Sequence, residues 1–574
     1  MLVLGLHRDP FHHSGASVVY DDGKTLTVKA ISEERLNRKK YSSEYPDRSI
    51  EYCLKAVGAN SIEDCDYVVS DYFFRPTWNL YQHYKIYEPR QLKRKLLFYY
   101  RLYRAQLTRK YKIPTNKIHF IRHHLAHAYT AFCPSGFDTA AVLIVDGHGT
   151  VAPGVDVERL DFSRRRTFDS GTLETQSLFI GRDNNIELVE FSAKTGIGML
   201  YEAFTKFVGF GELEEGKTMG LAPLGRNCKN SYVEFNGSFK GMDTDYSYLV
   251  DIWSKINKGV KQTNLTPAQS KGLETNAYYS RIAWEVQCET EKAMIHLARY
   301  ARENTGIKNL CLAGGVALNS VANYKIYYEK IFDGMWIQPA SSDCGIPIGC
   351  ALYGYYKLAG GTKKWKEDKT YLGIEYDNDC VRSALNKYAD RITVEENVGS
   401  EKVAELLAND VIIGWFQGAS ESGPRALGNR SILMDPRKVE NKDILNSRVK
   451  FREGFRPFAP AVLVEYLQQY YNLDVPCPHM LMVPPTKEDK QNLIPAVVHV
   501  DGTGRVQTVS RDDNSRFYSL IESFRQLTGI PVILNTSFNI AGDPIVETPA
   551  DAIRCFLGTQ IDALVIGSYL IKKR

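Results

Sequence analysis

The segment HHLAHA carries two histidines at a spacing that suits a metal ion. His123 and His127 are four residues apart, so on a helix both imidazoles project from one face. Asp146, after the apolar run AAVLIV, and Asp343, in SSDCGIPIG, could complete a set of two histidines and two carboxylates. Such a set suits a divalent transition metal such as iron, manganese or zinc. The alternative is a metal-free histidine cluster, and His124 is expected to support the site or the fold.

Two glycine-rich segments carry groups that could contact a nucleotide. GFGELEEGKTMGLAP contains Lys217, and GGVALN contains Gly314, Gly315 and Asn319. Glycines let the backbone come close to a ligand, and side chains nearby can then complete the contact. Together the segments predict an ATP cleft, whereas either one alone could equally be a surface turn. The basic segment EERLNRKK, which contains Lys39, is on its own typical of a solvated helix face.

A third cluster is a series of cations interrupted by glycine, proline and apolar residues. In ESGPRALGNRSILMDPR and KFREGFRPFAP the candidate ligand-binding cations are Arg425, Lys450 and Arg456. A solvated surface is the alternative, but it does not explain why apolar pairs such as Ala426-Leu427 alternate with the cations. Cations in a partly apolar pocket suit phosphate or carboxylate oxygens. The sequence therefore favours an anionic ligand here.

Other polar groups could take part in the same chemistry. DGTGRVQTV adds Arg505, and NTSFN supplies Asn535 and Ser537 after an apolar strand; side chains of this kind are equally often satisfied by backbone groups. His12 and His13 in HHSGASVV could accept a proton, because an unperturbed imidazole titrates near neutrality. The chain has no G-x-S-x-G motif, so serine-hydrolase chemistry has no support.

The elements that must position these groups alternate between strand and helix patterns. Apolar runs at LVLGL, ASVVY, TLTVKAI, AAVLIV, NLCLAGG, VIIGWFQG, PVILN and ALVIG predict strands. Helical spacing predicts a helix over 281–304 that ends at Gly306. This alternation predicts an α/β fold. The polar stretch GGTKKWKEDKTYLG predicts a boundary between domains 1–367 and 368–574, and we find no internal sequence repeat.

Composition excludes several classes of protein. Hydrophobic residues make up 44% and charged residues 24% of the 574 residues, as in globular enzymes. The net charge of +5 is too small to predict nucleic-acid binding. There is no signal-peptide core, no apolar run long enough to span a bilayer and no CxxC pair. We therefore expect a cytoplasmic enzyme with neither nucleic acid nor membrane as a partner.

The order of these motifs resembles the NodU/CmcH carbamoyltransferases, including the nebramycin-type O-carbamoyltransferases. The matching stretches include HHSGASVV, SEERLNRKKYSSEYP, HHLAHAYTAF, VDGHG, GKTMGLAP, LAGGVALN, SSDCGIPIG, GPRALGNRSIL, FRPFAP, RVQTV and NTSFN, nearly from end to end. The resemblance implies an N-terminal actin-like ATPase (ASKHA) lobe similar to threonylcarbamoyl-transfer enzymes, and a C-terminal YrdC-like α/β lobe.

The resemblance also implies an activity. The C-terminal lobe would convert carbamoyl phosphate and ATP, with Mg²⁺, to carbamoyl-adenylate. The N-terminal lobe would bind Fe²⁺ and transfer the carbamoyl group to a hydroxyl of a small-molecule acceptor, such as a natural product. A homodimer is compatible with this scheme. The implied metal ligands are His123, His127, Asp146 and Asp343; the nucleotide and adenylate contacts are Lys39, Lys217, Gly314, Gly315, Asn319, Arg425, Lys450, Arg456, Arg505, Asn535 and Ser537.

Two positions depart from the family pattern, and two other functions stay open. Ala419 stands where a basic residue is usual, and His13 stands where the family has Asp. The alternatives are a small-molecule kinase or ATPase of the actin-like group and a non-catalytic nucleotide-binding regulator. ATP turnover that requires carbamoyl phosphate would separate the carbamoyltransferase from both.

Overall fold

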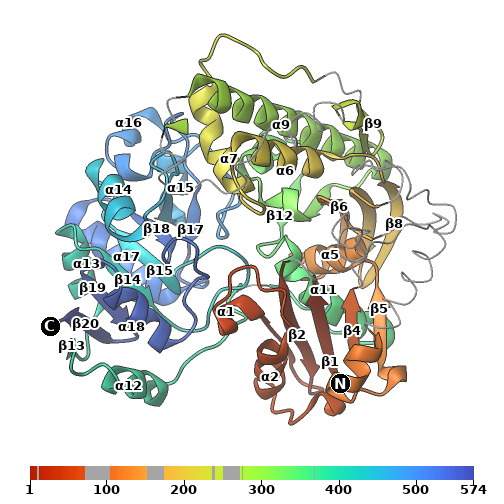
Figure 1. Cartoon of the computed structure of the whole chain (residues 1–574), viewed down its shortest axis with the longest axis horizontal. Coiled ribbons are helices and arrows are strands. Elements are labelled where there is room, and N and C mark those ends of the chain that lie inside the picture. The colour runs from red at the N-terminus through yellow and green to blue at the C-terminus, as the bar shows by residue number, and fades with distance from the viewer. Residues whose placement is uncertain are drawn as a thin grey trace, which may run out of the picture.

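The computed structural model describes residues 1–9, 12–71, 104–150, 173–235, 239–249, 272–273, 276–367 and 369–574. Within these ranges the strands form three large sheets, two from the N-terminal part and one from the C-terminal part. In Figure 1 the C-terminal sheet and its helices lie on the left, and the N-terminal sheets lie on the right. The predicted α/β class is confirmed.

The first sheet has the strand order β3-β2-β1-β4-β5. Strand β2 is antiparallel to β1 and to β3, whereas β4 is parallel to β1 and to β5. The strands are β1 (Leu2–Arg8), β2 (Ser14–Asp21), β3 (Leu26–Ser32), β4 (Tyr67–Asp71) and β5 (Ile118–Ile121). The predicted opening strands are therefore present.

The second sheet repeats this arrangement, with the order β12-β11-β6-β7-β8. Strand β7 is antiparallel to β6 and to β8, and β11 is parallel to β6 and to β12. The strands are β6 (Thr139–Val145), β7 (Gln176–Arg182), β8 (Asn185–Ser192), β11 (Asn309–Ala313) and β12 (Gly334–Ile337). The N-terminal part is thus a structural duplication that leaves no sequence repeat.

Helices pack between and around these two sheets. They are α1 (Glu33–Asn37), α2 (Asp47–Lys55), α5 (His123–Phe132), α6 (Ile197–Val208), α7 (Glu215–Leu221), α9 (Ala277–Thr305), α10 (Ser320–Tyr328) and α11 (Ile346–Tyr353). A small hairpin is formed by β9 (Phe239–Lys240) and β10 (Asp243–Thr244). Helix α9 contains the predicted helix 281–304 and ends at Gly306, which has a φ of +67°.

Helices α5 and α11 pack together between the two N-terminal sheets. Helix α11 contacts β1 and α5, and α5 contacts β6. Gly349 of α11 permits this close approach, because a Cβ there would lie 1.9 Å from the carbonyl oxygen of Ala126 in α5. Apolar side chains of both helices share one buried cluster with Val3 of the first sheet and Val142 of the second. The packing fixes the start of α5 beside the start of α11.

The C-terminal part is a mixed sheet with the order β13-β20-β19-β14-β15-β18-β16-β17. Its strands are β13 (Ile392–Glu395), β14 (Ile413–Phe416), β15 (Arg430–Met434), β16 (Ala459–Leu463), β17 (Gln507–Val509), β18 (Val532–Ser537), β19 (Ala563–Ile566) and β20 (Tyr569–Lys573). Its helices are α12 (Asn378–Asn386), α13 (Ser400–Ala408), α14 (Glu440–Leu445), α15 (Leu467–Tyr470), α16 (Glu488–Gln491), α17 (Ser515–Thr528) and α18 (Pro549–Leu557). Among the helices in the described ranges, none has the length and hydropathy that a bilayer crossing needs.

Helix α1 joins the two parts through buried and half-buried arginines. The guanidinium of Arg35 donates to the carbonyl of Gly423 at 3.3 Å. Arg38 donates to the carbonyls of Ile545 at 2.6 Å and Pro544 at 2.8 Å. Apolar side chains from both parts also belong to one continuous cluster. The N-terminal segment that follows β3 therefore lies against the C-terminal part (Figure 1).

Candidate functional site

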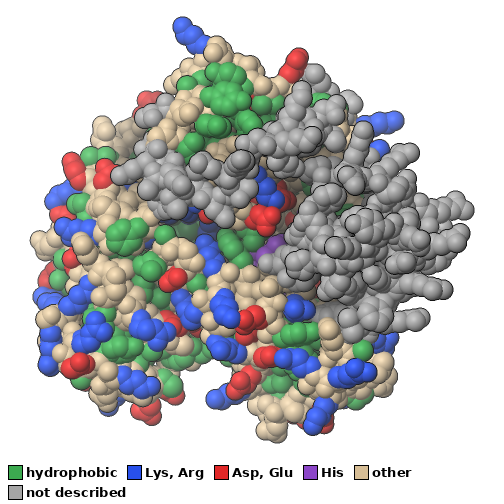
Figure 2. All heavy atoms as spheres, viewed as in Figure 1, with side chains coloured by type: hydrophobic (Ala, Val, Ile, Leu, Met, Phe, Trp, Pro, Cys, Tyr) green, Lys and Arg blue, Asp and Glu red, His purple; other side chains and the backbone are tan. Residues whose placement is uncertain are grey.

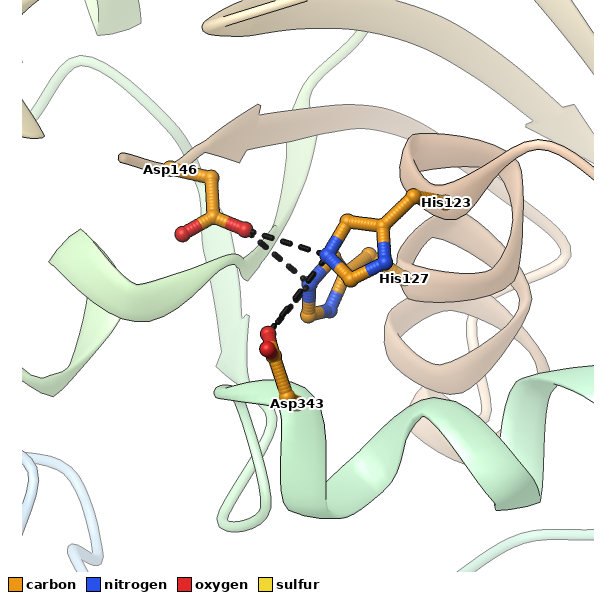
Figure 3. Close-up of side chains that lie close together, drawn as sticks. All are labelled: His123, His127, Asp146 and Asp343. Atoms are coloured by element: carbon orange, nitrogen blue, oxygen red, sulfur yellow. Dashed lines mark ion pairs between the residues drawn. The ribbon is translucent and has the colours of Figure 1, made fainter. Parts of the chain in front are cut away.

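Four buried side chains from three segments meet where β6, α5 and the short helix before α11 come together (Figure 3). His123 and His127 both lie on α5, one turn apart. Asp146 directly follows β6, and Asp343 begins the turn Asp343–Gly345. The predicted helix over HHLAHA and the predicted strand before Asp146 are thus confirmed, and the structure brings the four candidate ligands together.

The distances between these groups fit a metal ion. The Nε2 atom of His123 lies 3.4 Å from Oδ2 of Asp146 and 3.4 Å from Oδ1 of Asp343. The Nε2 atom of His127 lies 3.3 Å and 3.8 Å from the same two oxygens. A tetrahedral ion with ligand bonds of ~2.0–2.1 Å separates its ligands by about 3.3–3.4 Å. Both ring nitrogens of His127 are buried without a hydrogen bond in the described structure, so the residues fit a bound transition metal.

Backbone amides hold Asp146 in this orientation. Its Oδ1 atom accepts hydrogen bonds from the backbone nitrogens of Gly147 at 2.8 Å and Gly315 at 3.1 Å, which leaves Oδ2 facing the histidines. Gly314 has a φ of +91°, and a Cβ there would lie 2.3 Å from the carbonyl oxygen of Val145. The structure therefore places Gly314 and Gly315 against a candidate metal ligand; their predicted nucleotide contact stays a prediction.

The charges of the cluster depend on one another. Burial opposes ionisation of Asp146 and Asp343, but His123 and its neighbours hold the pKa of both carboxyls well below the usual range. Burial would also lower the pKa of His123, yet Asp146, Asp343 and Asp71 raise it well above its usual value. Buried carboxylates that stay ionised require a positive partner. Protonated His123 supplies it in the absence of an ion, and a divalent cation can replace that proton.

A second group of histidines adjoins the first. The Nδ1 atoms of His12 and His13 lie 2.9 Å apart, and Nδ1 of His12 lies 3.6 Å from Oδ2 of Asp343. His7 was not among the predicted residues; its Nδ1 lies 2.8 Å from Oδ1 of Asp71, and its Nε2 lies 3.9 Å from Oδ2 of Asp343. The structure therefore brings both predicted histidines, and a third one, to the same carboxylate.

The predicted cations of the C-terminal part also gather around one place. Lys450 ends the π-helical turn Asn446–Lys450 and is buried. Its Nζ atom donates to the carbonyl and hydroxyl oxygens of Ser537 at 2.8 and 3.2 Å, and to the carbonyl and side-chain oxygens of Asn539 at 3.0 and 2.7 Å. The predicted pair Lys450 and Ser537 is thus in contact, and burial and the charge of Arg452 lower the pKa of Lys450 well below its ordinary value.

The arginines beside Lys450 repel one another. Desolvation and the charge of Arg456 lower the pKa of Arg425 to about 10. Desolvation and the neighbouring arginines also lower the pKa values of Arg452 and Arg505 well below the usual range. The Nε atoms of Arg425 and Arg505 are buried without a hydrogen bond within the described structure. An anionic ligand would relieve this repulsion, because it supplies the missing negative charge.

Acidic groups offset only part of this charge. Glu453 lies 3.6 Å from Arg456 and 3.1 Å from Lys217. Lys217 also pairs with Glu214 at 2.7 Å. The structure therefore places Lys217 at the edge of the cation cluster, where protein carboxylates already hold its ammonium group. Desolvation and Arg456 also lower the pKa of Lys40, which sequence reasoning did not select.

Three other predicted contacts lie elsewhere. Lys39 is exposed and pairs with Glu44. Asn319 accepts a hydrogen bond from the amide at the start of α10 and exchanges hydrogen bonds with Gln287. Asn535 is fully buried, and its amide donates to Gln507 at 2.7 Å. Protein groups occupy the side chains of Lys39 and Asn319, whereas the Oδ1 atom of Asn535 is buried without a hydrogen bond in the described residues. The ligand contacts predicted for all three remain predictions.

Two other arginines of the basic segment have structural roles. Arg430 is fully buried, lies 3.7 Å from the ring centroid of Phe416 and donates to the carbonyl of Gln417 at 2.6 Å. Arg437 pairs with Asp435 at 2.6 Å. These contacts explain why apolar residues alternate with cations in this segment: Arg430 belongs to the core, whereas Arg425 lies in the cation cluster.

Tyr41 lies between the histidine group and the cation cluster. Its ring makes an edge contact with His13 at a centroid distance of 5.4 Å, and its hydroxyl donates to the carbonyl of Leu213 at 3.1 Å. Its phenol is also close enough to Arg456 and Arg425 for their charges to affect one another. Figure 2 shows histidine, lysine and arginine side chains in the hollow at the centre of the molecule. The two sites therefore adjoin across the boundary between the two parts.

Several of these groups had a signal in the sequence. Asp71 ends the apolar run YVVSD, the same pattern that singled out Asp146. His7 lies near the end of the opening strand LVLGLHR, and Arg452 lies between two predicted cations. Tyr41 has no distinguishing pattern, and its position between the two sites follows only from the packing.

Comparison with known proteins identifies close relatives. Two family models match: "Carbamoyltransferase N-terminus" over residues 3–352 and "Carbamoyltransferase C-terminus" over residues 404–573. Nodulation protein NolNO of Sinorhizobium fredii is 37% identical over 98% of this chain and 79% of its own length. Nodulation protein NolO of Bradyrhizobium diazoefficiens is 35% identical over 79% of each chain. Among solved structures, phosphate- and nucleotide-bound full-length HypF aligns with a TM-score of 0.32 and 14% identity, over 64% of this chain and 56% of its own.

Proposed function

Since the chain belongs to the carbamoyltransferase family of enzymes, we propose that it is an ATP-dependent O-carbamoyltransferase. The substrates are carbamoyl phosphate, ATP with Mg²⁺, and a hydroxylated small molecule. One site makes carbamoyl-adenylate, and a neighbouring site transfers its carbamoyl group to the acceptor. The observation that carries this proposal is the cluster of mutually repelling cations around Arg425 and Arg505, next to a separate His/Asp site.

The cation cluster suits the adenylation step. Carbamoyl phosphate and ATP are both anions, and they must approach each other before a mixed anhydride can form. Arg425, Arg456 and Lys450 would screen the phosphate oxygens and align the reactants, which is catalysis by positioning and electrostatics. Water first cleaves carbamoyl phosphate, which releases inorganic phosphate and leaves carbamate. A carbamate oxygen then attacks the α-phosphorus of ATP, and pyrophosphate leaves. Arg505 and Ser537 would complete the contacts to the adenylate.

The His/Asp site suits the transfer step. His123, His127, Asp146 and Asp343 would hold Fe²⁺ or another divalent transition metal, which as a Lewis acid polarises a carbonyl group when bound. His12 would accept the proton of the acceptor hydroxyl as its oxygen attacks the carbamoyl carbon, and AMP would leave with the electrons of the broken C–O bond. Burial and His12 lower the pKa of His13 to about 4, which makes His13 a weak base.

The fold is consistent with this division of labour. We infer an actin-like ATPase lobe over 1–367, supported by the duplicated sheet topology, and a YrdC-like lobe over 368–574. Tyr41 adjoins both sites, so the two proposed reactions would take place next to each other. We place the nucleotide contacts of the N-terminal lobe at Gly314 and Gly315, which adjoin Asp146.

One assay tests the proposal directly. The purified enzyme is mixed with ATP, Mg²⁺ and carbamoyl phosphate without an acceptor, and nucleotide and phosphate products are separated by ion exchange. We expect pyrophosphate release that requires carbamoyl phosphate, because adenylation is separate from transfer. ADP as the main nucleotide product would instead indicate a kinase or ATPase of the actin-like group. Absence of turnover, with nucleotide binding retained, would indicate a regulator.

A further inference from the structure

Asp343 directs its two carboxylate oxygens at different histidines. Its Oδ1 atom faces Nε2 of His123 at 3.4 Å and Nε2 of His127 at 3.8 Å. Its Oδ2 atom faces Nδ1 of His12 at 3.6 Å and Nε2 of His7 at 3.9 Å. A carboxylate placed between two sets of imidazole nitrogens has the geometry of a ligand that bridges two metal ions.

The donor atoms on the Oδ2 side lie close enough together to share an ion. Nδ1 of His12 and Nδ1 of His13 are 2.9 Å apart, and one ligand atom from each of His12, His13 and Asp343 lies within 4.8 Å of the other two. Ligand bonds of ~2.0–2.1 Å allow spacings of about 2.9–3.4 Å between adjacent donors. A hydrogen bond between the two imidazoles would also explain the short contact, so the number of bound ions must decide between the two explanations.

Carboxylates contact the second ring nitrogen of these imidazoles, the one that does not face Asp343. Asp71 lies 2.8 Å from Nδ1 of His7 and 2.8 Å from Nδ1 of His123, which directs the Nε2 atom of each ring at Asp343. The Nε2 atom of His7 is buried without a hydrogen bond in the described structure, and the side chain is 1% exposed. Asp9 lies 3.6 Å from Nε2 of His12, the nitrogen that points away from His13. Metal-binding histidines usually have such a carboxylate behind the ring.

The backbone at His13 adds an independent indication. Its φ is +58°, in the left-handed region that non-glycine residues seldom adopt. Residues held in such conformations concentrate at ligand and catalytic sites, where the surrounding structure fixes them. At His13 this conformation places the imidazole beside that of His12.

We propose that a second divalent transition-metal ion binds next to the first, held by His12, His13 and Asp343 with His7 as a further donor. Asp343 then bridges a two-metal site with ions ~3.5–4 Å apart. An ion in this position would lower the pKa of a bound acceptor hydroxyl, which would ease the loss of its proton in the proposed transfer. This role rests on the proposed function, whereas the site itself does not.

Metal counting tests the proposal without any substrate. Chelator-treated full-length protein is reloaded with Co²⁺ alone, passed through gel filtration and analysed for cobalt per chain. We expect about two ions in the wild type and about one in His13→Gly, because glycine tolerates the left-handed backbone and removes only the imidazole. His127→Ala should also retain about one. His296→Ala is the matched control and should bind two ions. His296 lies on α9, outside the cluster, and its Nε2 atom contacts the carbonyl of Gly241.

Reloading with Mn²⁺ gives a second measurement. Two carboxylate-bridged Mn²⁺ ions would give an exchange-coupled electron paramagnetic resonance spectrum, and His13→Gly would give the spectrum of an isolated ion. Saturation of the wild type at about one Co²⁺ per chain, or two ions retained by His13→Gly, would overturn the proposal. Neither measurement depends on carbamoyl phosphate or ATP, so failure here is distinct from failure of the proposed function.

Discussion

Asp71 and His123 lie on different elements and form a hydrogen bond of 2.8 Å between Oδ2 and Nδ1 in the buried part of the N-terminal lobe. Because Nδ1 of the imidazole is occupied in this way, Nε2 is the atom presented to Asp146 and Asp343. Carboxylates behind metal-binding histidines fix the ring and raise its basicity. We therefore expect Asp71 to affect metal affinity, although it is not among the proposed ligands.

We expect Asp71→Asn to weaken metal binding by about 10–100-fold. The amide keeps the shape of the side chain but loses the charge that orients both His7 and His123. Competition with a chromophoric chelator measures the affinity. Asp333→Asn is the control, because Asp333 is exposed and pairs with Lys308 on the surface. Equal affinities in the two variants would show that Asp71 has no part in holding the ion.

His127→Ala separates the two proposed reactions. This change removes a ligand from the His/Asp site, so acceptor carbamoylation should fall below detection. Pyrophosphate release from ATP and carbamoyl phosphate should stay within about twofold of wild type, because that reaction uses the other lobe. Labelled carbamoyl phosphate follows the first reaction, and a pyrophosphate assay follows the second. Transfer that survives with unchanged metal content would show that the histidine is structural.

Lys450→Ala and Arg456→Ala should have the opposite pattern. Each removes a charged contact to an anionic ligand, a loss of about 1.5–3 kcal/mol, so pyrophosphate release should fall by at least tenfold while metal content is unchanged. Arg448→Ala is the matched control for Lys450. It belongs to the same π-helical turn, but its side chain is half exposed and lies 3.9 Å from Asp562. Normal pyrophosphate release by Lys450→Ala and Arg456→Ala would exclude this cluster as the adenylation site.

The local part of the candidate metal site was predictable from the sequence. The spacing of His123 and His127 fixes their common face on a helix, and the apolar run before Asp146 predicts a strand that ends at a carboxylate. The convergence of these groups with Asp343 is a property of the fold. It depends on the packing of α11 against α5 through Gly349, which no local pattern reports.

The adjacent residues Lys39 and Lys40 show the limit of the same reasoning. Composition treats them alike and both are exposed, yet Lys39 pairs with Glu44, whereas desolvation and the charge of Arg456 lower the pKa of Lys40. Only the backbone that follows α1 decides which side chain faces the C-terminal lobe. The duplicated sheet could likewise not be predicted. The strand order of each half depends on its apolar patterns and on the connections between its strands, and the two halves share no repeated residues that would reveal it.

A final prediction concerns stability and pH at Glu367, far from the metal ligands in sequence and 3% exposed. Burial raises the pKa of its carboxyl from an ordinary value of 4.5 to about 8, although Gln338 and Thr370 oppose the shift. A carboxyl whose pKa is higher in the folded state binds more protons when folded, so its contribution to stability is complete below about pH 4.5. This contribution declines as the pH rises toward 8, by up to ~1.4 kcal/mol per pH unit.

We therefore expect the melting temperature of the wild type to fall between pH 5 and pH 8 relative to that of Glu367→Gln, which is neutral throughout. Scanning calorimetry on both proteins across this range measures the difference. Glu303→Gln, an exposed position on α9, controls for the general effect of removing one carboxylate and should run parallel to the wild type. If Glu367→Gln also runs parallel to the wild type, the carboxyl titrates normally and is solvated in solution. If the two curves diverge as the pH rises, Glu367 is protonated in the folded enzyme at neutral pH. Its neutral carboxyl then brings no unpaired charge into the interior beside Gln338.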